Sequence, residues 1–382
     1  MLTGKHRSTR CIIDRSALQH NYLAIKNRLA PHKKVWAVVK ADGYGHGAVQ
    51  VAKTLDKIGA DGFCVAISDE ALELRQAEIT APILILGITH PHYAWLHATE
   101  NISVTISSVE WLESALVERQ PGTNFPPLHV HLKVDTGMGR IGVRSLDEGQ
   151  AIVDFIAAHP DAFILEGIFT HYATADGDSE KEQSLCRTQT KRFDSFEHQL
   201  DLSQLPNQSL FHRSNSAMAV WQPEKTLDFV RLGIALYGVN PSNGAMSMPS
   251  DLDLKPVLTW ETKIDFVKQM HAGETISYGA TYTASEGEWI GTLPIGYADG
   301  FNRALTGFEV IVNGELCPIV GRVCMDQCLI RLPEELPMGT RVTIIGTNRG
   351  VTNTAEDLSN YLNTIAHEVF CGISTRVQRV YH

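Results

Sequence analysis

The sequence lacks the features of membrane-spanning, exported and nucleic-acid-binding proteins. No apolar run approaches the roughly 20 residues that a membrane-spanning helix needs. The first residues, MLTGKHRSTRCIID, contain no apolar signal-peptide core, so we expect no export. The net charge is −10 and there is no stripe of lysine and arginine, which opposes binding to a phosphate backbone. These absences predict a cytoplasmic protein whose partners include neither a membrane nor a nucleic acid.

The chain also lacks a disulfide framework and a metal motif. Its seven cysteines are odd in number and irregularly spaced, and 382 residues can bury a core without covalent cross-links, which favours reduced thiols in a cytosol. Cys324 and Cys328 form a C-x₃-C spacing that would place both thiols on one side of a strand. No second Cys or His pair lies nearby to complete a tetrahedral site. We therefore expect no metal, and two small buried hydrophobic residues.

Two glycine-rich nucleotide motifs are missing as well. The stretch VWAVVKADGYGHGA (35–48) has the spacing G-x-G-x-G, whereas a dinucleotide fingerprint needs G-x-G-x-x-G. The phosphate-loop pattern G-x-x-x-x-G-K-[ST] is absent. We expect these glycines instead to let a bulky ligand approach the backbone closely.

From residue 35 to about 240, apolar runs alternate with amphipathic helical stretches. The helical patterns cover 68–78, 108–120, 145–159 and 179–200. Strand-like runs lie at 35–39, 63–67, 82–87, 102–106, 129–134, 163–169 and 209–212. Strands buried on both faces and joined by helices predict a parallel sheet. Either 11–14 or 228–233 supplies an eighth strand, which favours a (β/α)₈ TIM-type barrel over an open doubly wound sheet.

After about residue 243 the pattern changes to short alternating strands separated by glycine and proline turns. This pattern predicts a mostly β second domain. We expect a barrel domain over 1–243, with N-terminal residues that can reach the second domain, and a β domain over 244–382.

Polar residues follow the apolar runs of the predicted barrel, where its catalytic residues are expected. They include Lys40, Arg140, His171, Asn215, Ser216 and Arg231. A lysine at a strand end is most often a surface residue, but partial burial here would lower the pKa of Lys40 and free its amine to form an imine. Ser216 is either a plain helix N-cap or, with the backbone of 231–234, a phosphate ligand. An imine-forming lysine and a phosphate site together point to pyridoxal 5′-phosphate (PLP).

Eight segments resemble, in order, the signature segments of bacterial alanine racemases. They are AVVKADGYGHGA, HLKVDTGMGRIGV, THYATAD, NSA, VRLGIALYG, ISYGATYTA, LPIGYADG and GRVCMDQ. The resemblance runs from about residue 10 to the end. It implies a PLP-dependent racemase of alanine that supplies D-alanine for peptidoglycan. It also implies a homodimer in which each active site is completed by the β domain of the other subunit.

The resemblance implies specific roles. Lys40 would bind the cofactor and act as the base on one face of the substrate, and Tyr278 of the other subunit would be the opposing base. Phosphate contacts would come from Tyr44, Ser216 and the backbone of Gly233 and Ile234, with Asn215 nearby. Arg231 would face the pyridine nitrogen, with His171 linking it toward Tyr278. Arg140 and the Met325 N–H would hold the substrate carboxylate, and Tyr297 would narrow the entrance, with Asp326 close by.

The residue chemistry agrees with these roles. Racemisation needs an acid/base group on each face of Cα. A tyrosine has a reference pKa of about 10, so a path through His171 to a cationic arginine would help it act as a base. Arginine does not readily give up a proton, so Arg231 would leave the pyridine nitrogen unprotonated and the ring a weaker electron sink.

Two further positions carry expectations from the resemblance. Lys133 lies seven residues before Arg140, where the family often has a carbamylated lysine that hydrogen-bonds the arginine; the alternative is a lysine paired with an ordinary carboxylate. His367 stands where the family typically has a tyrosine that reaches the phosphate. This departure leaves a serine racemase, or a dual alanine/serine racemase, as an alternative function.

Two other classes share parts of the pattern. PLP-dependent decarboxylases of basic amino acids also join a barrel to a β domain, but they typically place an acidic residue at the pyridine nitrogen, where Arg231 stands here. A non-enzymatic PLP-binding homeostasis protein would resemble the barrel alone, and the region that carries Tyr278 argues against it.

Overall fold

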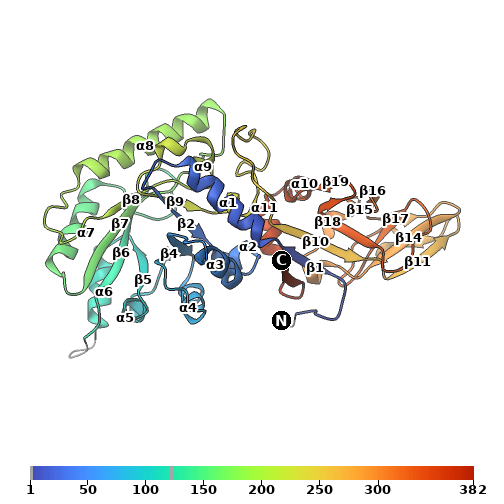
Figure 1. Cartoon of the computed structure of the whole chain (residues 1–382), viewed down its shortest axis with the longest axis horizontal. Coiled ribbons are helices and arrows are strands. Elements are labelled where there is room, and N and C mark those ends of the chain that lie inside the picture. The colour runs from blue at the N-terminus through green and yellow to red at the C-terminus, as the bar shows by residue number, and fades with distance from the viewer. Residues whose placement is uncertain (1–2, 120–123) are drawn as a thin grey trace.

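A computed structural model describes residues 3–119 and 124–382, in which the N-terminal part is a (β/α)₈ barrel (Figure 1). Over these residues, eight parallel strands pair in the order β8-β7-β6-β5-β4-β3-β2-β9. Their bounds are β2 Lys34–Val38, β3 Gly62–Val65, β4 Ile83–Ile88, β5 Ile102–Ile106, β6 Leu128–Lys133, β7 Phe163–Phe169, β8 Leu210–His212 and β9 Phe229–Leu232. A parallel bridge between Ser214 and Val230 joins the two ends of this order. The predicted barrel is confirmed.

The eighth strand comes from 228–233, as β9, and not from 11–14. All four residues of β9 are buried, as expected for a barrel strand covered on both faces. The other segment lies in β1 (Arg10–Ile13), whose burial alternates along the strand. It pairs with β10 (Leu258–Lys263) and β20 (Gln378–Tyr381) in the second domain. The alternating burial is typical of a sheet with one covered face.

Helices join the barrel strands, and the two that follow β6 and β7 begin at capping residues. Ser145 with Glu148, and Ser179 with Glu182, form capping boxes at the starts of α7 and α8. The bounds are α1 Arg15–Arg28, α2 Lys40–Tyr44, α3 Ala48–Asp56, α4 Ser68–Gln76, α5 Ala94–Thr99, α6 Val109–Val117, α7 Leu146–Ala158, α8 Glu180–Gln199 and α9 Ser216–Trp221. Each predicted helical stretch contains one of these helices.

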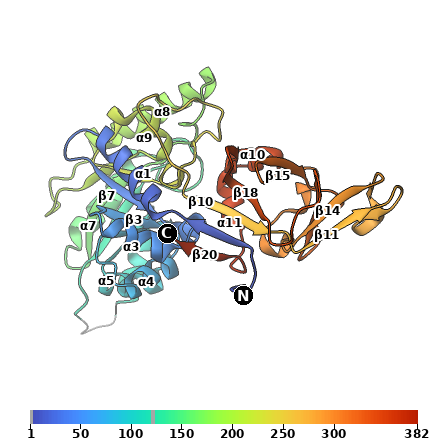
Figure 2. The ribbon, with the colours of Figure 1, turned by 45° about the vertical axis from the view of Figure 1, so that its right-hand side comes forward.

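The second domain is mostly β, as predicted. In the described residues its main sheet has the path β16-β15-β18-β10-β1-β20, with β19 paired to β18. A second sheet, β11-β14-β17, lies at the end of the molecule far from the barrel (Figures 1 and 2). The remaining bounds are β11 Phe266–Met270, β12 Thr275–Ile276, β13 Tyr282–Thr283, β14 Glu288–Leu293, β15 Glu309–Val312, β16 Glu315–Pro318, β17 Cys328–Leu332, β18 Arg341–Asn348, β19 Val351–Asn353, α10 Ala355–Tyr361 and α11 Ala366–Gly372.

The two ends of the chain meet at the junction of the domains. The parallel pairing of β1 with β20 places them side by side (Figure 2). One continuous cluster of buried residues includes Tyr237 after the barrel, Trp260 in β10 and Phe370 in α11. The C-terminal segment is therefore packed against the barrel, which brings α11 to the barrel mouth.

The two closely spaced cysteines differ from expectation. Strand β17 begins at Cys328, which is fully buried, whereas Cys324 lies in the preceding loop and is half-buried. The Cys324 N–H donates to the Gln327 carbonyl at 2.9 Å, so a tight turn separates the two residues. The prediction of two buried thiols in one strand is wrong for Cys324.

Two kinds of feature are absent from the described residues. They contain no helix that is long and apolar enough to cross a membrane. In the same residues, no three His, Cys, Asp or Glu side chains are grouped so that they could hold a metal ion.

Candidate active site

Lys40 lies two residues beyond the buried end of β2, after Val39, and begins an unusual turn. Ala41, Asp42, Gly43 and Tyr44 all have φ between 52° and 60°, so the chain makes a left-handed turn. Each non-glycine residue in this conformation costs roughly 1–2 kcal/mol. Hydrogen bonds hold the turn: the Ala41 N–H donates to Glu70 at 2.6 Å, and Asp42 accepts from the Ala48 N–H at 2.8 Å. The turn fixes the position of the lysine at the barrel mouth.

The glycines of this turn make room for protein and not for a ligand. A Cβ on Gly45 would overlap the Phe370 carbonyl of α11, and one on Gly47 would overlap the Tyr381 hydroxyl of β20. The Gly45 carbonyl also accepts from Arg379 Nε at 2.9 Å. The expectation of close ligand approach is therefore wrong for Gly45 and Gly47, because the C-terminal segment fills that space. This contact is what holds α11 beside Lys40.

One cavity of about 410 Å³ at the barrel mouth gathers most of the predicted residues. Ten of them line it: Lys40, Tyr44, Arg140, His171, Asn215, Ser216, Arg231, Gly233, Ile234 and His367. Nine come from the loops and strand ends of the barrel, and His367 comes from α11. The volume lies within the range usual for small-molecule sites.

Arg231 is buried in β9 and is fixed by several acceptors. Its Nη2 donates to the Thr170 carbonyl at 2.8 Å and to His171 Nδ1 at 3.2 Å, and its Nη1 donates to His212 Nδ1 at 2.8 Å. Burial lowers the pKa of Arg231 to about 10, so the guanidinium is still charged at neutral pH. Burial and the nearby Arg231 charge hold the pKa of His171 well below its ordinary value. The predicted pairing of His171 with Arg231 is present, with the histidine neutral.

Ser216 lies where a phosphate ligand was expected, and it is not the helix cap. Asn215 caps α9, because its side chain accepts from the Met218 N–H at 3.1 Å. The Ser216 hydroxyl oxygen instead accepts from the Gly233 N–H at 2.9 Å and the Ala235 N–H at 3.3 Å. With its lone pairs occupied, this hydroxyl is left as a hydrogen-bond donor at the cavity wall.

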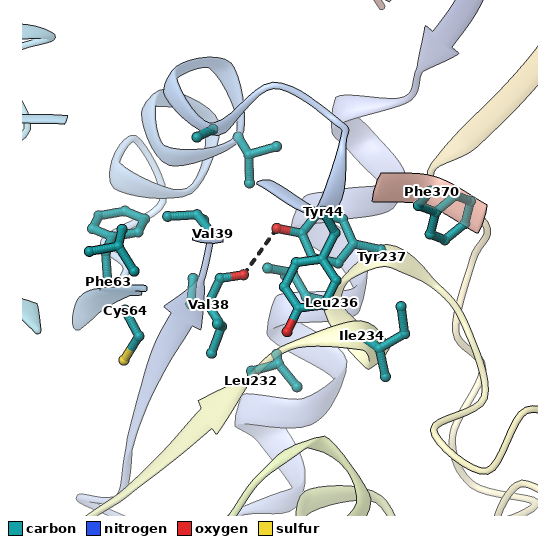
Figure 3. Packing of buried hydrophobic residues seen from close by; sticks show 14 of the residues in the cluster. Val38, Val39, Tyr44, Phe63, Cys64, Leu232, Ile234, Leu236, Tyr237 and Phe370 are labelled. Carbon is teal, nitrogen blue, oxygen red and sulfur yellow. Dashed lines mark hydrogen bonds between the residues drawn. The ribbon is translucent and has the colours of Figure 1, made fainter. Parts of the chain in front are cut away.

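Tyr44 closes the same end of the cavity. Its ring packs on Tyr237, whose hydroxyl donates to the Val38 carbonyl at 3.0 Å (Figure 3). A Cβ at Gly233 would lie 2.7 Å from the Tyr44 hydroxyl, so the backbone approaches this oxygen more closely than any other residue type would allow. Next along the chain, Ile234 begins the short helix η3 (Ile234–Tyr237), where a backbone N–H has no partner within the helix.

Positive side chains dominate the electrostatics of the mouth. Burial, with a smaller contribution from Arg140, lowers the pKa of Lys40. Lys133 is 4% exposed, and burial, Arg231 and Arg140 together hold its pKa well below the ordinary value. Within the described part of the chain, no carboxylate lies within ion-pair distance of its amine, so the expected alternative of an ordinary carboxylate partner is not supported. Lys133 and Arg140 line a second cavity of about 340 Å³ that also reaches Lys40.

His367 lies against Tyr44, with 5.7 Å between the ring centroids. Burial, with a smaller effect of the Lys40 charge, lowers its pKa to about 4, so the imidazole is neutral near pH 7. A neutral imidazole can donate from one ring nitrogen and accept at the other. The position where the family typically has a tyrosine is therefore part of the cavity wall.

Four predicted residues lie outside this cavity, on the surface of the β domain. Tyr278 begins the short helix η4 (Tyr278–Ala280) and is 72% exposed. Tyr297 and Met325 are also exposed, as is Asp326, which pairs with Arg376 at 2.7 Å. A single chain therefore does not bring them to Lys40.

Three polar side chains inside the barrel have no counterpart among the predicted residues. They are His131, Glu166 and His212. The sequence does hold one indication of polar side chains on a single face of this strand. In the stretch HVHLK, His129, His131 and Lys133 alternate with apolar residues and so face the same way.

The chain is similar to alanine racemases over its whole length. Two family descriptions match: "Alanine racemase, N-terminal domain" over 13–241 and "Alanine racemase, C-terminal domain" over 257–381. An alanine racemase of Lactiplantibacillus plantarum is 45% identical over 385 residues, covering 100% of this chain and 99% of the relative.

Solved structures give the same result. An alanine racemase from E. faecalis matches with a TM-score of 0.93 and 46% identity, covering 100% of each chain. A histidine racemase from Leuconostoc mesenteroides matches with a TM-score of 0.90 and 34% identity, covering 100% of this chain and 99% of the other. Because both domain families match in chain order, this chain belongs to the alanine racemase family of PLP-dependent enzymes.

Proposed function

We propose that this protein interconverts L- and D-alanine by moving the Cα proton between two bases, with PLP bound at the barrel mouth. The observation that carries this proposal is the single cavity that joins Lys40, whose pKa is lowered, to Arg231 and Ser216. A lysine of this kind is a covalent anchor for a carbonyl group, and an arginine is a poor proton donor to a pyridine nitrogen.

The residues present fit the cofactor. The Ser216 hydroxyl, the Ile234 N–H and the Tyr44 hydroxyl lie at one end of the cavity and could donate to a phosphate, and the lack of a side chain at Gly233 makes room there for the Tyr44 hydroxyl. Lys40 would hold the aldehyde carbon, and Arg231 would face the ring nitrogen. When bound, PLP withdraws electrons from Cα of the amino acid and so makes its hydrogen acidic.

Two residues would move the proton. Lys40 would take or deliver it on one face of Cα, and Tyr278 would act on the other face. The surface position of Tyr278 supports its contribution to a second copy of the chain, because a base that serves its own subunit would face its own cavity. We therefore infer a homodimer with shared active sites.

The other residues would bind and orient the substrate. Arg140 and the Met325 N–H would hold the carboxylate, and a neutral His171 would connect Arg231 toward Tyr278 of the other subunit. Tyr297 and Asp326 would narrow the entrance, and the ion pair between Asp326 and Arg376 would fix that edge. In a bacterial cytoplasm, the D-alanine formed would supply peptidoglycan synthesis.

The proposal is tested with alanine deuterated at Cα. We expect the purified protein with PLP to release deuterium to water and to convert either enantiomer to a racemic mixture, measured by chiral chromatography. A PLP-binding homeostasis protein would bind the cofactor but leave the deuterium in place. Retention of both deuterium and configuration would contradict the proposal.

A serine or dual-specificity racemase is the second candidate, and His367 is the observation that favours it. Its ring replaces a longer phenol against Tyr44 and changes the shape and polarity of the wall. We expect His367→Tyr to raise the ratio of alanine to serine activity by about five- to 150-fold, since a small difference in the shape of a pocket is worth roughly 1–3 kcal/mol.

The substrate panel should contain alanine, serine and histidine, the last because a histidine racemase is among the similar structures. Lys5→Ala, at an exposed surface residue, is a matched control and should leave all ratios unchanged. An unchanged ratio in His367→Tyr would show that this position does not set specificity.

We further propose that Lys133 is carbamylated. Its buried amine is held toward the neutral form, which can add to CO₂ to give a carbamate with release of one proton. The negative charge formed would lie near Arg140, which lines the same cavity. We expect native mass spectrometry to find the mass of one CO₂ above that of the polypeptide with PLP.

Lys133→Ala should raise KM for alanine by about tenfold or more, because loss of a charge-assisted hydrogen bond to Arg140 costs roughly 1.5–3 kcal/mol. Lys263→Ala, at an exposed position in β10, is the control. A bare amine at Lys133 in electron density, together with a normal KM in Lys133→Ala, would refute the proposal.

A further inference from the structure

Arg231 carries a buried charge without a direct counter-ion. It is 3% exposed, and among the described residues no carboxylate lies within ion-pair distance of its guanidinium. A buried charge is costly unless hydrogen bonds or an opposite charge compensate it. The hydrogen bonds of Arg231 therefore show where compensation comes from.

A continuous path of hydrogen bonds leads from Arg231 through the barrel interior to Glu166 in β7. Arg231 Nη1 lies 2.8 Å from His212 Nδ1, and His212 Nε2 lies 2.9 Å from His131 Nδ1. His131 Nε2 lies 3.0 Å from Glu166 Oε2. Both histidines are fully buried, so water does not interrupt the path.

The direction of every hydrogen bond in this path is fixed by the arginine. A guanidinium can only donate, so His212 Nδ1 must accept and its proton lies on Nε2. His212 Nε2–H then donates to His131 Nδ1, and His131 Nε2–H donates to the Glu166 carboxylate. An additional proton on either imidazole would place two N–H groups against each other at one of the links.

The surroundings hold both rings in place. His212 is sandwiched between Phe169 and Phe229, with centroid distances of 4.7 Å and 4.0 Å. His131 packs against Gly167, where a Cβ would lie 2.5 Å from its Nδ1. Neither ring can turn without displacing its neighbours.

Glu166 is held in the charged form at the other end of the path. Burial alone would raise the pKa of its carboxyl, but hydrogen bonds from His129 and His131 outweigh this and hold the pKa well below the ordinary value. Ser103 also donates to it. The carboxylate is therefore available as a full negative charge.

We propose that Glu166 is the counter-charge of Arg231 and a positioning residue for the racemisation site, connected to it by His131 and His212 as neutral imidazoles that each carry their proton on Nε2. The positioning role rests on the proposed function, in which Arg231 faces the cofactor, whereas the pairing of charges and the proton positions do not. The path would keep the guanidinium charged. Because Nη1 donates to His212 and Nη2 donates to Thr170 and His171, Nε is the guanidinium donor that has no partner within the described residues and could face the site.

Neutron diffraction from crystals of the deuterated holoenzyme tests the path directly. We expect a deuteron on Nε2 and none on Nδ1 of both His131 and His212. A deuteron on Nδ1 of either ring would overturn the proposal. This measurement does not depend on the substrate, so it stands even if the protein racemises no alanine.

Kinetics of Glu166→Gln test the consequence, because this change removes the charge but keeps an acceptor for His131. We expect kcat to fall about tenfold, the effect of roughly one pKa unit on the guanidinium, with KM for alanine changed less than about twofold. The visible absorbance of bound PLP should shift, and Glu166→Asp should restore most of kcat.

His129→Gln is the matched control. His129 lies 3.4 Å from the other Glu166 oxygen and is not between Glu166 and Arg231. Because glutamine keeps an N–H that can donate to the carboxylate, Glu166 should stay charged, and kcat and absorbance should be unchanged. Equal losses in both variants, or no loss in Glu166→Gln, would reject the role of the charge. If Glu166→Gln does not fold, the neutron experiment still tests the proton positions in the path, and the kcat of Glu166→Asp still tests whether a carboxylate is sufficient at this position.

Discussion

Lys40→Ala is expected to reduce racemisation by at least about 10⁴-fold, because it removes both the covalent anchor and one of two acid/base groups. The visible absorbance of lysine-bound PLP should disappear, while the thermal unfolding temperature of the apoprotein should change little. The half-exposed position of Lys40 in a turn held by other residues is the reason for the second expectation.

Lys53→Ala provides the comparison for this variant. Lys53 is an exposed lysine on α3, in the helix that follows the same turn. It should retain wild-type activity and absorbance. Substantial racemisation by Lys40→Ala with PLP would mean that another residue is the base.

Tyr278→Phe is expected to lower kcat by about 10²–10⁴-fold, the usual contribution of a general acid/base. A stronger prediction concerns dimers that contain one chain of Lys40→Ala and one chain of Tyr278→Phe. Lys40→Ala and Tyr278→Phe should each have about 1% of wild-type activity or less, but a heterodimer of the two contains one site with both wild-type residues if the sites are shared. Random assembly makes about half of the dimers heterodimers, each with one intact site of two, so about a quarter of wild-type activity should return.

Unfolding and refolding the two variants together, or coexpressing them with different tags, produces the mixture. A mixture of Lys40→Ala with the double variant should remain inactive, because none of its dimers has an intact site. If Lys40 and Tyr278 served the same chain, no mixture of the two single variants would regain activity. That outcome would disprove the shared site.

The barrel could be predicted because its strands are buried on both faces and its helices carry capping residues. These are local properties: the burial of β7 and the capping box of Ser145 with Glu148 follow from short stretches of sequence. Whether residues 11–14 form a barrel strand could not be predicted from the local sequence. Their pairing with β10 and β20 joins residues far apart in the chain, and only the folded chain selects between such partners.

The glycines after Lys40 are a second case in which local sequence could not predict a contact between distant segments. Their spacing indicates a turn without side chains, but it does not say what fills the space. The Phe370 carbonyl and the Tyr381 hydroxyl fill it, which places His367 against Tyr44. The polar path from Arg231 through His212 and His131 to Glu166 was not predicted either. Its four residues lie on four strands, and β8 and β9, at the two ends of the strand order, come together only when the barrel closes.

The fold class, the family and most of the residues at the barrel mouth could be read from the amino-acid sequence, since strand ends carry their polar residues wherever the strands pair. The tertiary structure alone decided which residues one chain can assemble. It placed Lys40, Arg231 and Ser216 around one cavity and left Tyr278 on the surface of the other domain. The physical reason is that contact between distant segments depends on packing and on the direction in which each side chain projects, and neither is encoded in local spacing.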